Sequence, residues 1–456
     1  MTRQEGVTVI PRFDILREQL RLILANKRDQ GHVTDGLEAE LEGLPQSYDA
    51  LAVFARKLTT LPLRPDWPHV EPNDLAGIWA ECDPTRPLGV IRPVDLGDSA
   101  RRVEAAFQGS VCGCILGKPL EIRPTLAQIR TALEGIGEWP LNDYISERLR
   151  PGLTGQFHRS WPESVRERLA YVPADDDLNY TILGMLLLEQ HGLTFTRAQV
   201  RDLWLHQLPI LYAFGPERTL LLKAGLDTLE PVGAPGDMED WVSFWNPRDE
   251  WCGAMIRADA YGYACPGRPA LAAELAWRDA SFTHRRTGIY GTMFAAAAIA
   301  TAQVAESWSE IFETALKFVP RRSRYYQAVA NCLEEIHRAS DWLDGYYRVH
   351  IRYEQYGHCR IFQETGTLIN TLRFAESVGD GICKQVSQGN DTDSYGATVG
   401  SILGAFFGPG HLEERWLRPF NDEIRTSLAL FYERSLSRLA KRMGELPGRI
   451  AAELKH

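Results

Sequence analysis

The sequence predicts an all-α fold. Apolar residues recur at helical spacing along most of the chain, and the alternation typical of strands is sparse. No internal repeat or low-complexity segment interrupts this pattern. The 456 residues include 44% apolar and 24% charged side chains, which is ordinary for a soluble globular protein with a sizeable core.

Residues 1–98 are predicted to form a helical and irregular N-terminal segment, packed on a main domain of residues 99–456. Apolar residues in 13–24 and in 51–58 recur as they do in helices. The stretch 61–93 is rich in proline and tryptophan. We expect an irregular but folded connector there, because tryptophans need burial.

Charge and cysteine content limit the classes of function. The chain has 50 basic and 60 acidic residues, a net charge of -10, which argues against a general nucleic-acid binder. Eight cysteines are scattered without a CxxC pair, so neither a zinc ribbon nor a thioredoxin-type site is indicated.

The distribution of apolar residues bears on location. No long apolar core lies near the N-terminus, so we expect no signal peptide. The longest uncharged run, 287–305, is rich in alanine and glycine, which favours a buried helix over a membrane span. A reducing cytoplasm is therefore the expected location.

The first helix of the main domain is predicted over 101–116, and Glu121 follows shortly after its end. Small residues dominate one face of this helix, which implies close packing. By position alone, Glu121 is either a solvated loop residue or an active-site carboxylate. The polar stretch 134–170 is loop-like, and long loops are often functional.

Three successive carboxylates, Asp175, Asp176 and Asp177, precede a strongly apolar helix. This is more negative charge than an N-cap requires. The three groups repel one another, so we expect a counter-charge close by. A bound cation would supply it, and exposure to solvent would also relieve the repulsion.

A second acidic motif, Asp391-Thr392-Asp393-Ser394, opens another apolar helix. Oxygen-only side chains packed this tightly are typical ligands of Mg²⁺ or Mn²⁺. The alternative is an Asp N-cap with a polar first turn. Glycines recur every four residues along the helix, so another backbone can approach one bare face. These glycines are Gly396, Gly400 and Gly404.

Three other segments complete the chain. His284, just before the alanine-rich helix, is a cap, a core-edge histidine or a ligand-facing group. Arg285 and Arg286 are surface charges or phosphate contacts. After residue 409, apolar residues at 428, 430, 431, 436 and 439 predict an amphipathic helix with a basic exposed face.

Four fragments in this order resemble the ADP-ribosylglycohydrolase family, which includes the dinitrogenase-reductase-activating glycohydrolases. They are 109–121, Asp175-Asp176-Asp177, Thr283-His284 with its glycine-rich sequel, and 389–394. The resemblance covers roughly residues 99–410. It implies a compact all-helical bundle that carries two divalent metal ions, Mg²⁺ or Mn²⁺.

The resemblance also implies roles for single residues, carried over by motif position. The implied metal ligands are Asp175, Asp176, Asp177, Asp391, Asp393 and Ser394. The implied catalytic residues are Glu121, Asp176 and Asp391. The implied substrate-binding residues are Glu121, Arg257, His284, Gly389 and Asn390.

The chain departs from the family pattern at four positions. Cys114 lies where the family has the aspartate of a Gly-Asp pair, and Asp175 lies where it has a metal-binding threonine. Asn390 replaces the second glycine of the last motif. Ser394 replaces a threonine and keeps the hydroxyl.

The resemblance implies hydrolysis of an N- or O-glycosidic bond to ADP-ribose, with ADP-ribose or an ADP-ribosylated substrate as the partner. Two alternatives stay open. Cys114 and Asp175 motivate an ADP-ribose-binding relative without turnover. A hydrolase of the same fold could also act on a different ribosyl nucleotide.

Overall fold

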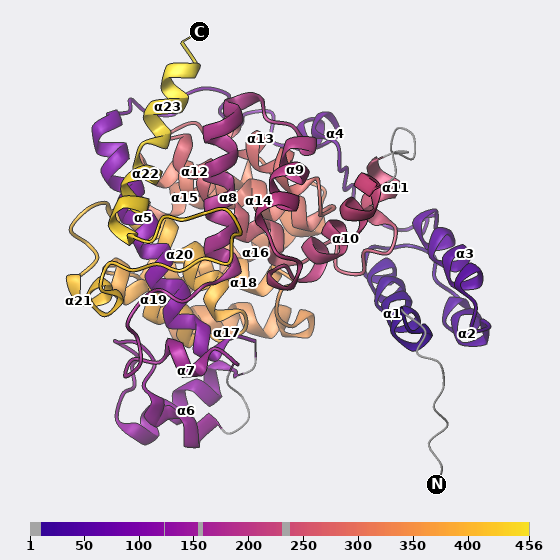
Figure 1. Ribbon diagram of the computed structural model, residues 1–456, viewed down its shortest axis with the longest axis horizontal. Helices are drawn as coiled ribbons and strands as arrows, with labels where there is room; N and C mark the ends of the chain where they lie inside the picture. The colour runs from indigo at the N-terminus through magenta and orange to yellow at the C-terminus, as the bar shows by residue number, and fades with distance from the viewer. Residues whose placement is uncertain (1–10, 123, 154–157, 230–237, 456) are drawn as a thin grey trace.

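The computed structural model describes residues 11–122, 124–153, 158–229 and 238–455. Helices follow one another through these residues (Figure 1). Strand pairing among them is limited to isolated bridges, such as that between Thr125 and Gly389. The all-α prediction is therefore confirmed.

The N-terminal helices α1 to α3 form a small group beside the main body (Figure 1). Leu20, Leu41 and Phe54 belong to a core of their own, and the rings of Phe244 and Trp245 pack against it. The bounds are α1 Phe13–Asp29, α2 Leu37–Gly43, α3 Tyr48–Thr59 and α4 Leu75–Glu81. The helices predicted in 13–24 and 51–58 are confirmed as α1 and α3.

The first half of the main body runs from α5 to α13. Its α-helices are α5 Leu96–Gly117, α6 Leu126–Ile136, α7 Trp161–Ser164, α8 Asp176–His191, α9 Arg197–Gln207, α10 Gly215–Leu229, α11 Met238–Ser243, α12 Asp259–Ala264 and α13 Pro269–Ala280. Short 3-10 helices are η1 Lys118–Leu120, η2 Glu147–Leu153, η3 Gly192–Thr194, η4 Ile210–Tyr212 and η5 Cys252–Arg257. The predicted boundary at residue 98 falls inside α5.

The second half runs from α14 to α23. Its α-helices are α14 Thr287–Ala302, α15 Trp308–Leu316, α16 Arg324–Arg338, α17 Trp342–Tyr353, α18 Phe362–Phe374, α19 Val378–Ser387, α20 Thr392–Phe407, α21 Glu414–Leu417, α22 Leu436–Gly444 and α23 Leu446–Glu453. Two 3-10 helices are η6 Glu354–Tyr356 and η7 Arg418–Phe420.

Helices α5 and α20 pack with their backbones in contact. A Cβ on Gly400 would lie 2.1 Å from the carbonyl oxygen of Gly109, and one on Gly396 would lie 2.3 Å from that of Gly113. Such distances leave no room for a side chain. The bare face predicted from the glycine spacing is thus confirmed. Through it, the backbone of α20 packs directly against that of α5.

Helix α14 is buried along its whole length, as predicted for the alanine-rich run. Among the described residues, no helix has the length and hydropathy to cross a membrane. Two buried threonines in α14 bond within the helix: the Thr292 hydroxyl donates to the Gly288 carbonyl oxygen at 2.8 Å, and that of Thr301 to the Ala297 carbonyl oxygen at 2.7 Å.

The amphipathic helix predicted after residue 409 is wrong in extent. Helix α22 begins only at Leu436, and residues 421–435 are irregular. Isolated bridges join Ile424 to Val172 and Glu423 to Ser435. The apolar residues at 428 and 430 do not share a buried face, because Leu428 is buried and Leu430 is 56% exposed.

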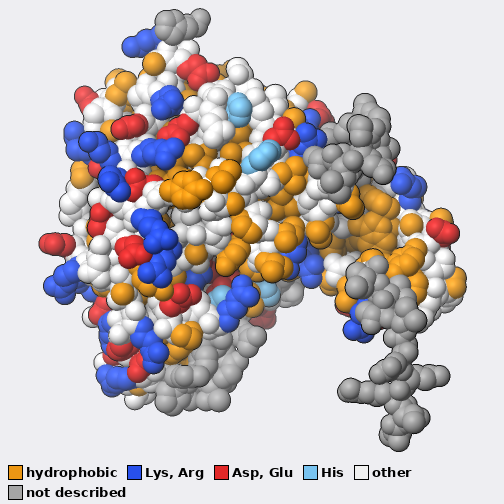
Figure 2. Space-filling view, viewed as in Figure 1, with side chains coloured by type: hydrophobic (Ala, Val, Ile, Leu, Met, Phe, Trp, Pro, Cys, Tyr) orange, Lys and Arg blue, Asp and Glu red, His pale blue; other side chains and the backbone are white. Residues whose placement is uncertain are grey.

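The face shown in Figure 2 mixes basic and acidic side chains, and hydrophobic ones gather between the main body and α1 to α3. Ala52, Val53 and Phe244 line a shallow hollow there. The N-terminal helices thus meet the main body partly through apolar contacts. The acidic motifs lie elsewhere, where α5, α8 and α20 come together (Figure 1).

Candidate active site

Three helix ends meet at the candidate site. The chain leaves α5 through η1 to reach Glu121, and α8 and α20 begin at the two acidic motifs. The Thr392 hydroxyl donates a hydrogen bond to the Gly117 carbonyl oxygen at 2.7 Å. The Ile122 amide donates to the Asn390 carbonyl oxygen at 2.8 Å. These bonds hold the start of α20 against the end of α5.

The turn before α20 uses left-handed backbone. Gly389 has φ +78° and Asn390 has φ +65°. A Cβ on Gly389 would lie 2.7 Å from the Pro124 carbonyl oxygen, so only glycine fits there. Asn390 tolerates the left-handed region better than most residues. Both residues therefore have a backbone role in presenting Asp391.

The structure brings five of the acidic residues predicted for the site into two close groups. Ligand atoms of Glu121, Asp391 and Asp393 all lie within 4.8 Å of one another. A neighbouring group, Cys114, Asp175 and Asp177, meets the same distance. The negative charge of Asp391 acts on Asp177, and that of Glu121 acts on Asp393, so the two groups form one electrostatic network.

The carboxyl groups of this network are buried close together, so their ionised forms repel one another. Burial, followed by the charges of Asp175 and Asp176, raises the pKa of Asp177 well above its usual range. Burial and then Glu121 raise the pKa of Asp393 in the same direction. One carboxylate oxygen of Asp177, Oδ1, is buried and makes no hydrogen bond to the described residues.

Lys118 supplies one positive charge next to the three acids, where a counter-charge was predicted without a named residue. Its Nζ donates to Asp175 Oδ2, and both side chains are buried. Burial raises the pKa of Asp175, but the Lys118 ammonium outweighs it and the net pKa is lowered. Asp175 Oδ1 also accepts from the Asp177 amide at 3.0 Å. Asp175 is thus both a helix cap and an ion-pair partner.

Cys114 lies beside this group from α5. Its thiol is 3.9 Å from Asp177 Oδ2 and donates to it. Burial, and then the charge of Asp175, raises the pKa of Cys114 well above its usual range. The thiol is therefore a weak, neutral neighbour where the resembled family has a carboxylate.

The Glu121 carboxyl lies between the acidic network and His158. Burial, followed by the charge of Asp391, raises its pKa to about 7. His158 Nδ1 lies 3.5 Å from Glu121 Oε2, and the His158 amide donates to the Pro119 carbonyl oxygen. His158 lies in the long polar stretch 134–170, but no local pattern distinguishes it from other loop histidines.

Arg257 and His284 are engaged away from the acidic network. Arg257 donates to Asp279 at 2.7 Å and to Glu217 at 2.6 Å, and all three side chains are buried. His284 Nδ1 lies 3.7 Å from Glu217. Burial and then Arg257 lower the pKa of His284 well below its usual value, so this ring is neutral. These contacts make both residues part of a core network.

Two other predicted ligands complete the site. The Ser394 amide donates to Asp393 Oδ1 at 2.9 Å, and its side chain is largely buried in the first turn of α20. Burial, followed by Asp175 and Glu121, raises the pKa of Asp176 well above its usual range, so Asp176 belongs to the same network.

The donor set suits a hard divalent cation. Carboxylate oxygens dominate, and Asp177 Oδ1 lacks a partner among the described residues. Their mutual repulsion would be relieved by positive charge beyond that of Lys118. The residues present therefore fit the metal that the sequence resemblance implies.

Comparisons with known proteins identify the family of the chain. The family model described as ADP-ribosylglycohydrolase matches residues 96–448. A comparison with curated proteins gave no match. A solved structure described as "ADP-ribosylglycohydrolase-related protein complex" is similar at 18% identity and a TM-score of 0.48, over 78% of this chain and 99% of that one. By the family match, the chain belongs to the ADP-ribosylglycohydrolase family.

Proposed function

We propose that this protein is a metal-dependent hydrolase that cleaves an N- or O-glycosidic bond to ADP-ribose. The observation that carries the proposal is the convergence of Glu121, Asp391 and Asp393 within 4.8 Å, next to the carboxylates at the start of α8. The family match supports a glycohydrolase. The substrate is ADP-ribose attached to a protein side chain or another acceptor.

The proposed ligands of two Mg²⁺ or Mn²⁺ ions are Asp176, Asp177, Asp391, Asp393 and Ser394, with Asp175 held by Lys118 at the edge. When bound, the ions supply positive charge that orients the reacting water and the ribose hydroxyls. The carboxylates keep their geometry through the helix starts from which they project. Burial keeps bulk water away, which strengthens every charge interaction in the site.

Glu121 is the proposed proton-transfer residue. A carboxyl group with a pKa near 7 can accept a proton from water or pass one to the leaving group at neutral pH. The remaining carboxylates face the same space, so they stabilise the positive charge that develops on the ribose as the glycosidic bond breaks. Asp391 and Asp176 share this role through their place in the network.

Substrate would also meet the backbone before α20. Gly389 and Asn390 form the turn that leads directly into Asp391, and the Gly389 amide donates to the Val386 carbonyl oxygen. We propose that this turn contacts the ribose or the pyrophosphate. Arg257 and His284 would act on substrate only indirectly, because their side chains are held in the core network with Glu217.

The test is release of ADP-ribose from peptides modified on arginine or serine. We expect release with Mg²⁺ or Mn²⁺ and none with EDTA. Asp393→Asn should lower the rate at least about a hundredfold, because it removes a charged ligand while preserving size. Asp259→Asn is the matched control: Asp259 is also buried, but its partners are Ser401 and Ser110. Unchanged release by Asp393→Asn would contradict the metal assignment.

A second candidate is an ADP-ribose-binding relative without turnover. The Lys118–Asp175 ion pair favours it, because the Lys118 ammonium already neutralises one acid of the proposed metal-binding motif. Binding of ADP-ribose without release from either peptide, in both metals, would support this candidate. Release of a different nucleotide product would support a same-fold hydrolase of another substrate.

A further inference from the structure

Two thiols from segments far apart in the sequence converge on Asp391. Cys252 begins η5, and Cys359 lies in the loop before α18. Their Sγ atoms are 3.1 and 3.3 Å from the same oxygen, Asp391 Oδ2. The three ligand atoms all lie within 4.8 Å of one another, and all three residues are buried.

A buried carboxyl without a partner belongs to the same region of the chain. Glu364, in the first turn of α18, is 1% exposed, and neither of its carboxylate oxygens has a hydrogen-bond partner among the described residues. It follows Cys359 by five residues. Its oxygens do not join the group of ligand atoms that Cys252, Cys359 and Asp391 form within 4.8 Å.

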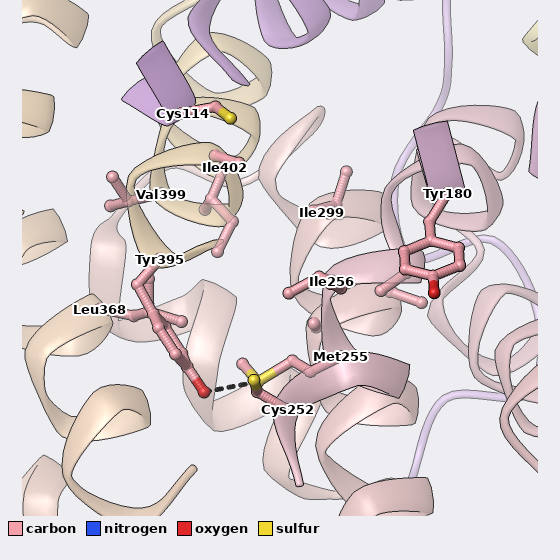
Figure 3. Close-up of a cluster of buried hydrophobic side chains, with 14 of the residues drawn as sticks. Cys114, Tyr180, Cys252, Met255, Ile256, Ile299, Leu368, Tyr395, Val399 and Ile402 are labelled. Atoms are coloured by element: carbon pink, nitrogen blue, oxygen red, sulfur yellow. Dashed lines mark hydrogen bonds between the residues drawn. The ribbon is translucent and has the colours of Figure 1, made fainter. Parts of the chain in front are cut away.

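Aromatic and sulfur-bearing side chains border the thiols. Figure 3 shows Met255 of η5 and Tyr395 of α20 side by side, with Cys252 labelled next to them. The Tyr395 hydroxyl donates to the Met255 sulfur at 3.8 Å. A buried carboxyl without a hydrogen-bond partner, such as that of Glu364, is costly, and a cation bound close by would lower that cost.

We propose that Cys252, Cys359 and Asp391 bind a thiophilic divalent cation such as Zn²⁺. Two sulfur donors and one oxygen donor from buried side chains are a ligand set that Zn²⁺ accepts, and its tetrahedral preference leaves one further position for a water molecule. The oxygen-lined network next to it has no such preference, because carboxylates and hydroxyls favour Mg²⁺ or Mn²⁺. Asp391 lies at the border between the two sites.

Each thiol would lose its proton to solvent as its bond to the metal forms, and no oxidation is involved.

The other thiol next to acids lacks these features. Cys114 stands alone beside Asp175 and Asp177, and Lys118 already neutralises Asp175. One thiol beside a carboxylate that is already paired with a lysine should bind a thiophilic metal more weakly than two thiols that contact the same carboxylate oxygen. Cys114 thus serves as an internal control for the proposal.

The test is titration of the full-length protein with Co²⁺, after removal of metals and with a phosphine reductant present. We expect one equivalent to produce a thiolate-to-cobalt charge-transfer band with the visible bands of tetrahedral cobalt, and Zn²⁺ to abolish them. Cys252→Ser and Cys359→Ser should each lose or strongly weaken the charge-transfer band. Cys114→Ser and Cys332→Ser, both changed at buried thiols outside the site, should keep it.

Folding is checked by circular dichroism and by Mn²⁺ binding, which the oxygen-lined site retains in correctly folded serine variants. Absence of the band in the native protein would overturn the proposal. So would a band that survives in both Cys252→Ser and Cys359→Ser, or one lost in Cys114→Ser. The readout is independent of ADP-ribose release, so failure of one proposal leaves the other testable.

Discussion

Lys118 changes the charge balance of the site more than any other single residue. Its ammonium is buried against Asp175. Asp175 occupies the position where the resemblance to the family implies a neutral threonine. The extra acid and the lysine therefore offset one another inside the chain. Burial of such a pair is costly, but removing one partner costs more, because the other is left uncompensated.

Lys118→Met should destabilise the metal-free protein by about 3 kcal/mol, measured by urea unfolding in EDTA. Added Mn²⁺ should restore most of this loss, since a cation can then neutralise Asp175. Lys441→Met is the control: Lys441 is exposed on α22, so its loss should change stability by no more than about 0.5 kcal/mol. Equal stability of native protein and Lys118→Met in EDTA would contradict the role given to the ion pair.

The sequence identified the acids but not their partners. Asp175 to Asp177 and Asp391 to Asp393 are dense local motifs, so their convergence could be expected from one family pattern. Lys118 gave no local signal, because a lysine after a helix end is usually solvated. Cys252 and Cys359 lie in separate segments, and only the folded chain brings both thiols to Asp391.

At the level of elements, contact between α5 and α20 sets the site. Gly400→Ala should destabilise the protein by about 3 kcal/mol, because its Cβ would lie 2.1 Å from backbone rather than from a flexible side chain. Gly135→Ala in α6 is the control. Its Cβ meets nothing within 4 Å, so better helix propensity should stabilise by up to about 1 kcal/mol. Chemical unfolding of both variants gives the comparison, and a neutral Gly400→Ala would exclude the backbone contact.

Local pattern predicted helices best where burial was uniform. The runs that became α14 and α20 are apolar or small along every turn, so no competing structure suits them. The stretch 428–431 shows the opposite case. Its apolar residues are at helical spacing, yet bridges that involve Val172 and Ser435 hold the surrounding segment in irregular backbone. Such partners are distant in sequence, so spacing alone could not reveal them.

For the whole molecule, the buried acids link stability to pH. Burial raises the pKa of Glu121 to about 7 and that of Glu364 to about 8, above their ordinary value of 4.5. A group with a raised folded-state pKa stabilises fully below its unfolded pKa, and this contribution is lost as pH rises through the folded value. Stability without metal should therefore fall between about pH 5 and pH 8. Glu217 and Asp259, also raised to about 7 by burial, add to this fall but lie outside the metal clusters.

A divalent cation should oppose this fall, because it binds the deprotonated carboxylates and competes with their protons. The stabilisation by Mn²⁺ should thus be larger at about pH 8 than at about pH 5, reaching about 2.7 kcal/mol at a hundredfold excess over Kd. Urea unfolding with Mn²⁺ and with EDTA at each pH measures the difference. Glu217 and Asp259 change the free energy of unfolding equally with Mn²⁺ and with EDTA. The difference between the two conditions therefore reports on the carboxylate network alone. The Asp393→Asn variant should lose the stabilisation by Mn²⁺. If Mn²⁺ stabilises the native protein equally at both pH values, the cation binds groups that are already ionised at acidic pH, which would contradict this prediction.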